Sequence, residues 1–216
     1  MKTLQFCMLT IIMLIANTNY SMNKKHSVRD NYKIGRTELF ESIKKYDVET
    51  CKNLFEKYKD LAHTQCEIEY ERGETHYFPI WYLLSLDSEN TNTIDSFISI
   101  TDIAKLIIQN ITDIKWLYNN IYFTLEKNYA TNKIAVSETT IQIFEKLFER
   151  ENEIFTDAKN SKNQEEIKKC MQYRKNINYN ISMFGQVFTI KTEKDKKFLQ
   201  VLLKHMNKDT NKSKSF

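Results

Sequence analysis

The sequence predicts an all-α fold in which short helix pairs stack on one another, and three observations lead to it. The 216 residues include only 1 Pro and 3 Gly, too few for a β-sandwich, which needs a turn signal roughly every ten residues. Apolar residues make up 41% of the chain, enough for a core, and they recur at helical spacing. A pair of short helical patterns also recurs, which is typical of repeat proteins.

Residues 1–21 differ from the rest of the chain and predict a secretory signal peptide. Lys2 precedes an apolar run over residues 4–16, and small or polar residues follow, which is the usual layout of such signals. The run is shorter than the roughly 20 residues that span a membrane. A buried N-terminal helix is the alternative. We therefore expect an exported chain, secreted or periplasmic, without a stable membrane span after the signal is removed.

The mature chain is expected to hold a polar leader at 22–34, a folded domain at 35–206 and a disordered basic tail at 207–216. Without residues 1–21 it has 31 basic and 28 acidic residues, a net charge of +3. This balance argues against nucleic acid as the main partner. The alternative function is binding of an anionic ligand or nucleic acid through the basic tail, which would be salt-sensitive.

The mature chain keeps three cysteines, Cys51, Cys66 and Cys170. An odd number at scattered spacing is not a disulfide framework. One bridge is compatible with an exporting compartment, but the sequence does not choose the pair. Cys51 lies within a helical pattern, so we expect it to be a small buried residue.

The first helix pair is expected at residues 37–45 and 49–60, each about two or three turns long. Tyr46 and Asp47 interrupt the helical pattern between them, and Asp47 with Thr50 three residues later can cap the second helix. Helices this short are marginal alone, so they must pack on one another and on their neighbours.

The same pattern returns three times along the chain. Second helices are expected at 101–113, 140–152 and 196–208, after first helices at 78–86, roughly 117–127 and roughly 179–190. Each second helix carries two adjacent apolar residues, and from their place in this pattern we expect Leu54 and either Leu106 or Ile107 to face the core. The four pairs are Leu54-Phe55, Ile107-Ile108, Leu147-Phe148 and Leu202-Leu203.

In its first half the chain resembles the ankyrin-repeat family, whose repeats open with Gly-x-Thr-Pro-Leu-His. Gly35-Arg36-Thr37 stands at Gly-x-Thr, and Phe78-Pro79-Ile80-Trp81 looks like a degenerate Thr-Pro-Leu-His. Pro79 would then occupy the first turn of a helix, where a missing N–H costs nothing. Gly73-Glu74-Thr75 resembles the β-turn finger that precedes a repeat. The departures are Glu38 in place of the proline, Phe40 in place of the histidine, and Tyr46 and Tyr58 in place of glycines.

The spacing of the repeated apolar pairs is irregular. Successive pairs begin 53, 40 and 55 residues apart, whereas the ankyrin period is about 33. We therefore expect insertions: a polar loop within 85–99, a smaller one near 128–137, and a charged stretch near 151–176. The alternative is a divergent all-α domain whose helix pairs imitate the repeat pattern.

No established catalytic motif is present, and we expect no enzyme activity and no cofactor. The sequence lacks a Walker A loop, Gly-x-Ser-x-Gly and His-Glu-x-x-His, the motifs that would indicate nucleotide, acyl-transfer or zinc chemistry. Cys51, His63, Cys66 and His76 could form a zinc set, but their spacing matches no standard site. The acidic residues are expected on solvated helix faces. A hydrolase remains a rival and would need a pocket with perturbed acids or a metal.

The resemblance implies a module that binds another protein, without a small-molecule substrate. In stacked repeats each unit buries its apolar face against its neighbours and leaves turns and first helices for a partner. The finger between the first two units therefore supplies the candidate contacts, because exposed aromatic and Arg side chains are frequent anchors. These are Glu71, Arg72, Glu74, His76 and Tyr77.

Overall fold

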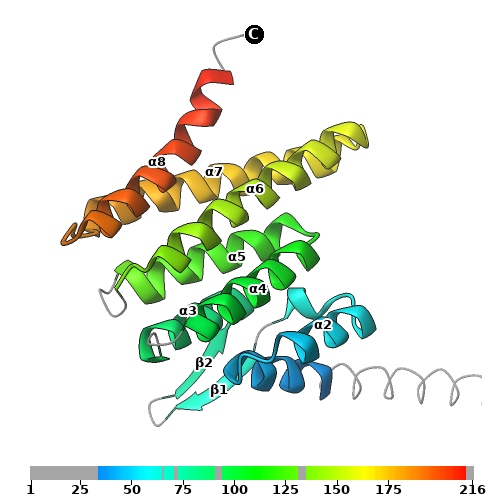
Figure 1. Cartoon of the computed structure of the whole chain (residues 1–216). Helices are drawn as coiled ribbons and strands as arrows, with labels where there is room; N and C mark the ends of the chain where they lie inside the picture. Colours follow the sequence, from blue (N-terminus) through cyan, green and yellow to red (C-terminus); the bar gives the residue numbers. More distant parts are fainter. Residues whose placement is uncertain (1–33, 65, 71–72, 91–93, 131–134, 213–216) are drawn as a thin grey trace, which may run out of the picture.

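The computed structural model describes residues 34–64, 66–70, 73–90, 94–130 and 135–212 (Figure 1). The expected signal peptide lies outside this part. The described chain is helical apart from one two-stranded β-hairpin, so the predicted helical class is confirmed with that one addition. After a helix at 34–44, the elements are α2 (Val48–Lys57), η1 (Leu61–His63), β1 (Cys66–Tyr70), β2 (Gly73–Tyr77), α3 (Pro79–Asn90), α4 (Ile94–Asn110), α5 (Ile114–Thr124), a π-helical turn η2 (Leu125–Ala130), α6 (Glu138–Asn160), α7 (Gln164–Val187) and α8 (Glu193–Lys212).

The helices form two rows. In one row α2, α4, α6 and α8 pack on one another in chain order, and in the other α3 packs on α5 and α5 on α7. The rows are joined because α3 packs on α4, α5 on α6 and α7 on α8. The described chain is thus a succession of helix pairs, rising in Figure 1 from α2 to α8.

The apolar core lies between the two rows, and the repeated apolar pairs contribute to it as expected. Leu54, Ile107 and Leu147 are buried, and Leu106 is partly buried. Leu203 is the exception: its side chain is 43% exposed. It lies on α8, the last helix of its row.

Two helix starts that the sequence predicts are confirmed. Asp47 caps α2, with its carboxylate accepting hydrogen bonds from the Thr50 N–H (2.9 Å) and hydroxyl (2.7 Å). Pro79 is the first residue of α3. Tyr46, the residue before Asp47, has a φ of 56°, a conformation that glycine adopts most easily. At Tyr58, the other position where the resemblance implies a glycine, φ is −130°.

Two of the stretches expected as insertions, the polar loop within 85–99 and the charged stretch near 151–176, are largely helical in their described residues. Within 85–99, α3 continues to Asn90 and α4 begins at Ile94. Within 151–176, α6 continues to Asn160 and α7 begins at Gln164. Buried residues such as Ile154 and Cys170 give these charged stretches an inward face. The extra spacing therefore lengthens helices more than it lengthens loops.

Further differences concern the two ends of the described chain. Gly35 lies inside the helix at 34–44 and not in a turn. A glycine is required there because the Tyr58 ring packs closely against the backbone: a Cβ added at Gly35 would lie 2.8 Å from that ring. At the other end α8 continues to Lys212, so residues 207–212 of the expected disordered tail are helical. Among the described residues, no helix is both long and apolar enough to span a membrane.

Candidate protein-binding surface

The predicted finger residues lie in and around a β-hairpin that follows α2 and precedes α3. The strands pair antiparallel, with Glu69 opposite Glu74 and Cys66 opposite Tyr77. The hairpin extends away from the stack below α3 (Figure 1). Glu74, His76 and Tyr77 belong to β2, whereas 71–72 lie outside the described residues.

A second candidate surface, which the sequence did not predict, is a continuous series of aromatic rings across the row of first helices. We name it the aromatic strip. It crosses the helix at 34–44, α3, α5 and α7. Its members are Phe40, Phe78, Trp81, Tyr82, Trp116, Tyr118, Tyr122, Phe123 and Tyr173.

The part of the strip between α3 and α5 is closely packed. The Phe123 ring stacks on Phe78 at 4.8 Å and on Trp81 at 6.0 Å between centroids. Phe78 and Trp81 are buried, while Phe123 keeps a partly exposed edge. On the other side, Tyr82 lies 5.3 Å from Phe40. This part anchors the strip in the core.

The part of the strip between α5 and α7 is made of tyrosines. Tyr118 stacks on Tyr122 at 5.8 Å and meets Tyr173 of α7 at 5.5 Å. The Tyr118 hydroxyl accepts a hydrogen bond from the Asn180 amide at 3.1 Å. A hydrogen bond to Glu126, followed by burial, raises the pKa of Tyr122 to about 12. The Tyr122 hydroxyl therefore stays neutral at neutral pH, and the bond from Asn180 orients the Tyr118 hydroxyl.

The strip packs helices against one another, and the exposure of its side chains indicates whether it also binds a partner. Rings that only joined helices would be closed off like the surrounding Leu and Ile side chains. Tyr82, Trp116, Tyr118, Tyr122, Phe123 and Tyr173 instead all remain partly exposed. A row of rigid rings with one accessible edge is a frequent anchor for a protein partner.

One edge of the strip is fixed by a polar cluster at the turn between α4 and α5. The His63 ring stacks on Trp116 at 6.0 Å, and its Nε2 accepts a hydrogen bond from the Thr112 N–H at 3.0 Å. Burial lowers the pKa of His63, although the charges of Asp60 and Asp113 act against this. His63 is thus held in its neutral form.

Asp113 joins this cluster to α7. Its carboxylate accepts from the Lys115 N–H at 2.7 Å, capping α5, and pairs with Lys169 at 2.8 Å. Burial acts to raise the pKa of Asp113, but the hydrogen bonds from Lys169 and Lys115 outweigh it and lower the pKa below its usual value. Asp113 therefore stays charged and ties α5 to α7.

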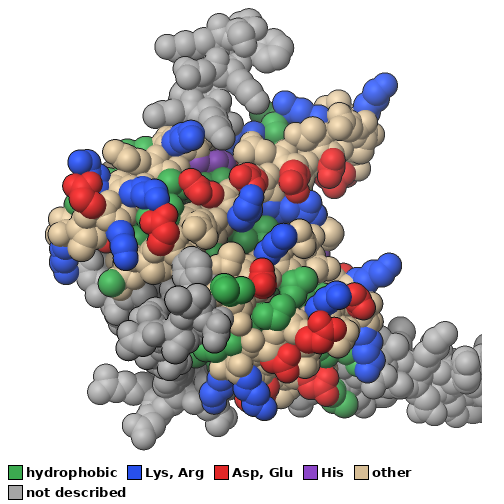
Figure 2. All heavy atoms as spheres, viewed as in Figure 1, with side chains coloured by type: hydrophobic (Ala, Val, Ile, Leu, Met, Phe, Trp, Pro, Cys, Tyr) green, Lys and Arg blue, Asp and Glu red, His purple; other side chains and the backbone are tan. Residues whose placement is uncertain are grey.

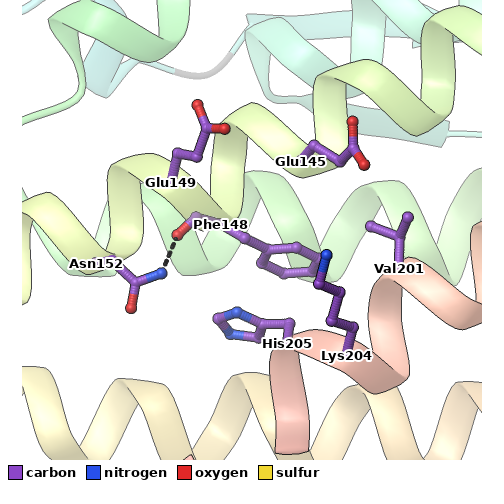
Figure 3. A pocket seen from close by; sticks show the side chains of 7 residues that line it. All are labelled: Glu145, Phe148, Glu149, Asn152, Val201, Lys204 and His205. Atoms are coloured by element: carbon purple, nitrogen blue, oxygen red, sulfur yellow. Dashed lines mark hydrogen bonds between the residues drawn. The ribbon is translucent and has the colours of Figure 1, made fainter. Parts of the chain in front are cut away.

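A hollow of about 220 Å³ lies between α6 and α8 (Figure 3). The imidazole of His205 stacks on Phe148 at 4.0 Å between centroids, and the Asn152 amide donates to the Phe148 carbonyl at 2.8 Å. Glu145, Glu149 and Lys204 also line it. Its walls carry both charge signs, so it favours neither an anion nor a cation.

Two acidic residues are buried in the part of the chain that the structure describes, Glu151 and Asp195, contrary to the expectation that the acids lie on solvated faces. The Asp195 carboxylate accepts hydrogen bonds from the Lys191 and Thr192 N–H groups just before α8. Glu151 of α6 is 0% exposed and makes two hydrogen bonds of 2.5 Å to the Arg174 guanidinium of α7. The guanidinium also donates to Asn152 and lies 4.1 Å from the Phe155 ring centre. The buried pair thus ties α6 to α7.

The other residues that could carry chemistry are dispersed. Cys51 and Cys170 are buried free thiols, and burial raises the pKa of Cys51 to about 12. Within the ranges that the structure describes, no three His, Cys, Asp or Glu side chains gather as metal ligands would. Compared with known families and with curated proteins, the chain matches no family model and no curated sequence.

Why did the aromatic strip escape sequence reasoning? The sequence does show abundant aromatic residues, 12% of the chain, and the i,i+4 pair Tyr118 and Tyr122 on one helix face. Placing them in one strip with Phe40, Trp81 and Tyr173 requires knowing that the helix at 34–44, α3, α5 and α7 lie side by side. That order is a property of the tertiary fold.

Proposed function

We propose that the chain is an exported, ankyrin-repeat-like module that binds another protein through the aromatic strip and the adjoining hairpin, without chemistry of its own. The observation that carries the proposal is the strip itself, a series of nine rings across the row of first helices, six of which are partly exposed. Large aromatic side chains dominate binding energy at many interfaces because they bury area at low entropic cost.

Three features support the ankyrin-like part of the proposal. The helix pairs follow one another in two rows. A hairpin extends between the first two units, where the family carries a finger. Tyr46, which stands where the ankyrin pattern has a glycine, has a φ of 56°, in the left-handed region that favours glycine. The helices α6 and α7, with 23 and 24 residues, are longer than the short helices of that family. The resemblance to ankyrin repeats therefore rests mainly on the first half of the chain.

The experiment is quantitative affinity capture with purified chain as bait against extracts and secreted fractions of the source cells. Tyr82→Ala with Tyr122→Ala removes two partly exposed rings of the strip. Ile98→Ala is the matched control, because Ile98 is 53% exposed on α4, in the other row. We expect the strip variant to lose one or more captured proteins that the control retains. Equal capture by all three proteins contradicts the proposal.

A second experiment tests the hairpin. Replacing Glu74, His76 and Tyr77 together by Ser, Ser and Thr removes three predicted contacts and keeps residues that a strand accommodates. We expect the affinity for a partner identified by capture to fall by about tenfold or more, the effect of losing one good anchor. Unchanged affinity would remove the hairpin from the binding surface.

Export is proposed on the sequence of residues 1–21 alone. N-terminal sequencing of the protein from its own cells tests it. A mature chain that begins near residue 22 supports removal of a signal peptide, whereas Met1 retained on protein inside the cells contradicts it.

A further inference from the structure

One side of α7 exposes three apolar side chains in succession. Tyr179, Met183 and Val187 are 64%, 44% and 56% exposed. Their spacing of four residues turns each side chain about 40° from the one before it, so the three span about 80° and share one face of the helix. We call these three residues the α7 ridge. Single exposed apolar side chains are normal, but several on one face indicate an interaction site.

The contacts of α7 explain why the ridge is open. α7 packs on α5, α6 and α8, and its fully buried side chains Ile177 and Ile181 each lie about 160° around the helix from Tyr179. The ridge is therefore on the side opposite to the core. α7 is also the last helix of its row, since α5 lies between α3 and α7, so no further helix of the described chain covers the ridge.

The ridge lies in a stretch of the chain without acidic residues. Residues 167–192 hold five basic residues and no acidic one, and the acidic residues of α7 stand in its first turn. Two of the five basic side chains pair with carboxylates of other helices, Arg174 with Glu151 and Lys169 with Asp113. The other three are exposed. They are Lys168, Lys175 and Lys191.

Two of these lysines adjoin the two ends of the ridge. Lys175 precedes Tyr179 by four residues and stands about one turn away on the same side of α7. Lys191 follows Val187 by four residues, which places it within about 14 Å of the end of the ridge. Lys and Arg side chains gather on the left of the molecule in Figure 2, where α7 meets α8 in Figure 1. The apolar ridge thus has positive charge at both ends.

We propose that the α7 ridge docks on the surface of an anionic lipid membrane, with its three side chains in the interface and the lysines at the headgroups. Charge complementarity selects this occupant, because anionic headgroups attract each lysine that approaches the surface. The apolar stem of a lysine can lie along the interface while its ammonium group stays in water. Tyr179 suits the same depth, since its ring is apolar and its hydroxyl polar.

Charge disfavours the pairing of two α7 ridges from two copies of the chain. In an antiparallel pair centred on Met183, Lys175 of one copy would face Lys191 of the other, because each lies eight residues from Met183. In a parallel pair Lys175 would face its own counterpart. Juxtaposed like charges disfavour association in either case.

The shape of the ridge favours lipid over an acidic protein. An acidic protein would also attract the lysines, but it would need a groove that matches side chains protruding from a single helix. A fluid lipid interface accepts such side chains without a matching shape. Docking at the ridge also leaves the aromatic strip accessible, because Tyr173, its member on α7, lies about 120° around the helix from Tyr179.

The test is co-sedimentation of the full chain with lipid vesicles in the absence of any protein partner, so its outcome is independent of binding at the aromatic strip. At about 0.1 M salt we expect vesicles with about 30% phosphatidylglycerol to bind the chain about tenfold more tightly than pure phosphatidylcholine does. At about 1 M salt, where the screening length is about 3 Å, the difference should largely disappear. Equal binding to both vesicles, or none at about 1 mM lipid, overturns the proposal.

Charge reversal tests the lysines beside the ridge. We expect Lys175→Glu with Lys191→Glu to weaken binding to the anionic vesicles by about tenfold or more. The control, Lys44→Glu with Lys52→Glu, makes the same charge change at exposed positions of the first helix pair and should bind like the wild type. Any contribution of the apolar N-terminal residues is common to all variants, so it cancels in the comparison.

Truncation tests the ridge itself without a change in charge. Tyr179→Ala with Met183→Ala should weaken binding to the anionic vesicles by about fivefold or more, because apolar area no longer enters the interface. Ile34→Ala with Ile98→Ala is the control, since both side chains are 53% exposed on other helices, and it should bind like the wild type. All four side chains are exposed, so the melting temperatures should stay close to that of the wild type.

Fluorescence of the Tyr179→Trp variant shows whether the ridge enters the lipid. The emission that this variant adds to that of the wild type should shift to shorter wavelength on anionic vesicles and be quenched by brominated lipids. Vesicle binding that the α7 variants leave unchanged overturns the proposal. Binding to soluble polyglutamate but not to anionic vesicles would assign the ridge to an acidic protein and overturns it as well.

Discussion

Asn120 of α5 supplies a hydrogen-bond acceptor to the first turn of α3. Pro79 begins α3 and has no N–H, so Ile80 is the first residue whose N–H needs an acceptor. The side-chain oxygen of Asn120 accepts a hydrogen bond from this N–H at 3.1 Å. The side-chain NH₂ of Asn120 donates to the backbone carbonyl of Trp116 at 2.8 Å. Asn120 is fully buried, so the contact joins α3 to α5 away from water.

We predict that Asn120→Ala lowers the free energy of unfolding by about 1–3 kcal/mol, the cost of a buried donor left without an acceptor. Asn119→Ala is the control, because Asn119 is partly exposed on the same helix. Its effect should stay within about 0.5 kcal/mol. Urea denaturation of both variants measures the difference, and equal losses would contradict the capping role.

His63 predicts how stability depends on pH. Burial lowers its pKa from 6.5, so the unfolded chain binds a proton more readily than the folded one does. The stabilisation is complete above about pH 6.5 and is lost as the pH falls below that value. His63→Gln keeps an acceptor for the Thr112 N–H but does not titrate. The wild type should lose more stability than this variant between about pH 7 and pH 5, measured by denaturation at each pH.

At the scale of single elements, α6 and α7 are long helices held together by a buried ion pair. We predict that Arg174→Met costs about 3–5 kcal/mol of stability because it leaves the Glu151 carboxylate buried and unpaired. Adding Glu151→Met should recover much of the loss, since no charge then remains. The exposed pair Lys146 and Glu149 is the control, and Lys146→Met should cost at most about 1 kcal/mol. A double variant less stable than Arg174→Met alone would contradict this account.

The start of α3 gives a second prediction for an element. Pro79→Ala should cost at most about 1 kcal/mol, because it mainly frees the unfolded chain. Adding Tyr82→Pro should cost about 3 kcal/mol or more, because it removes the 2.8 Å bond from the Tyr82 N–H to the Phe78 carbonyl. Thermal melts of the two variants compare them. Equal melting temperatures would argue against a helix that begins at Pro79.

At the scale of the whole molecule, stacking in order means that a defect in one unit should act mainly on its neighbours. Leu54 is buried in α2, and we predict that Leu54→Ala costs about 2–5 kcal/mol. Amide hydrogen exchange should accelerate in α2 and α4 and remain close to the wild type in α7 and α8. A uniform acceleration would show that the stack unfolds as a single cooperative unit.

The elements differ in how far the sequence could predict them. Asp47 and Pro79 gave correct helix starts because a cap or a first-turn proline acts on residues three or four positions away. In the stretch at 151–176 the many charges hide the inward-facing Glu151, Ile154 and Cys170, so its helices could not be predicted from the sequence. Leu203 is exposed although its pattern matches the buried pairs, because its exposure depends on the place of α8 at the end of its row.

The sequence by itself determined the helical class, several helix starts and most of the repeated buried pairs, since these depend on periodicity and caps within a few residues. The tertiary structure alone decided which helices are neighbours, and with that the aromatic strip and the buried ion pair. The Ile80–Asn120 contact joins residues 40 positions apart and the Glu151–Arg174 pair residues 23 apart. The physical reason is that such contacts form only where packing of the two rows brings distant side chains together, and no local pattern encodes that meeting.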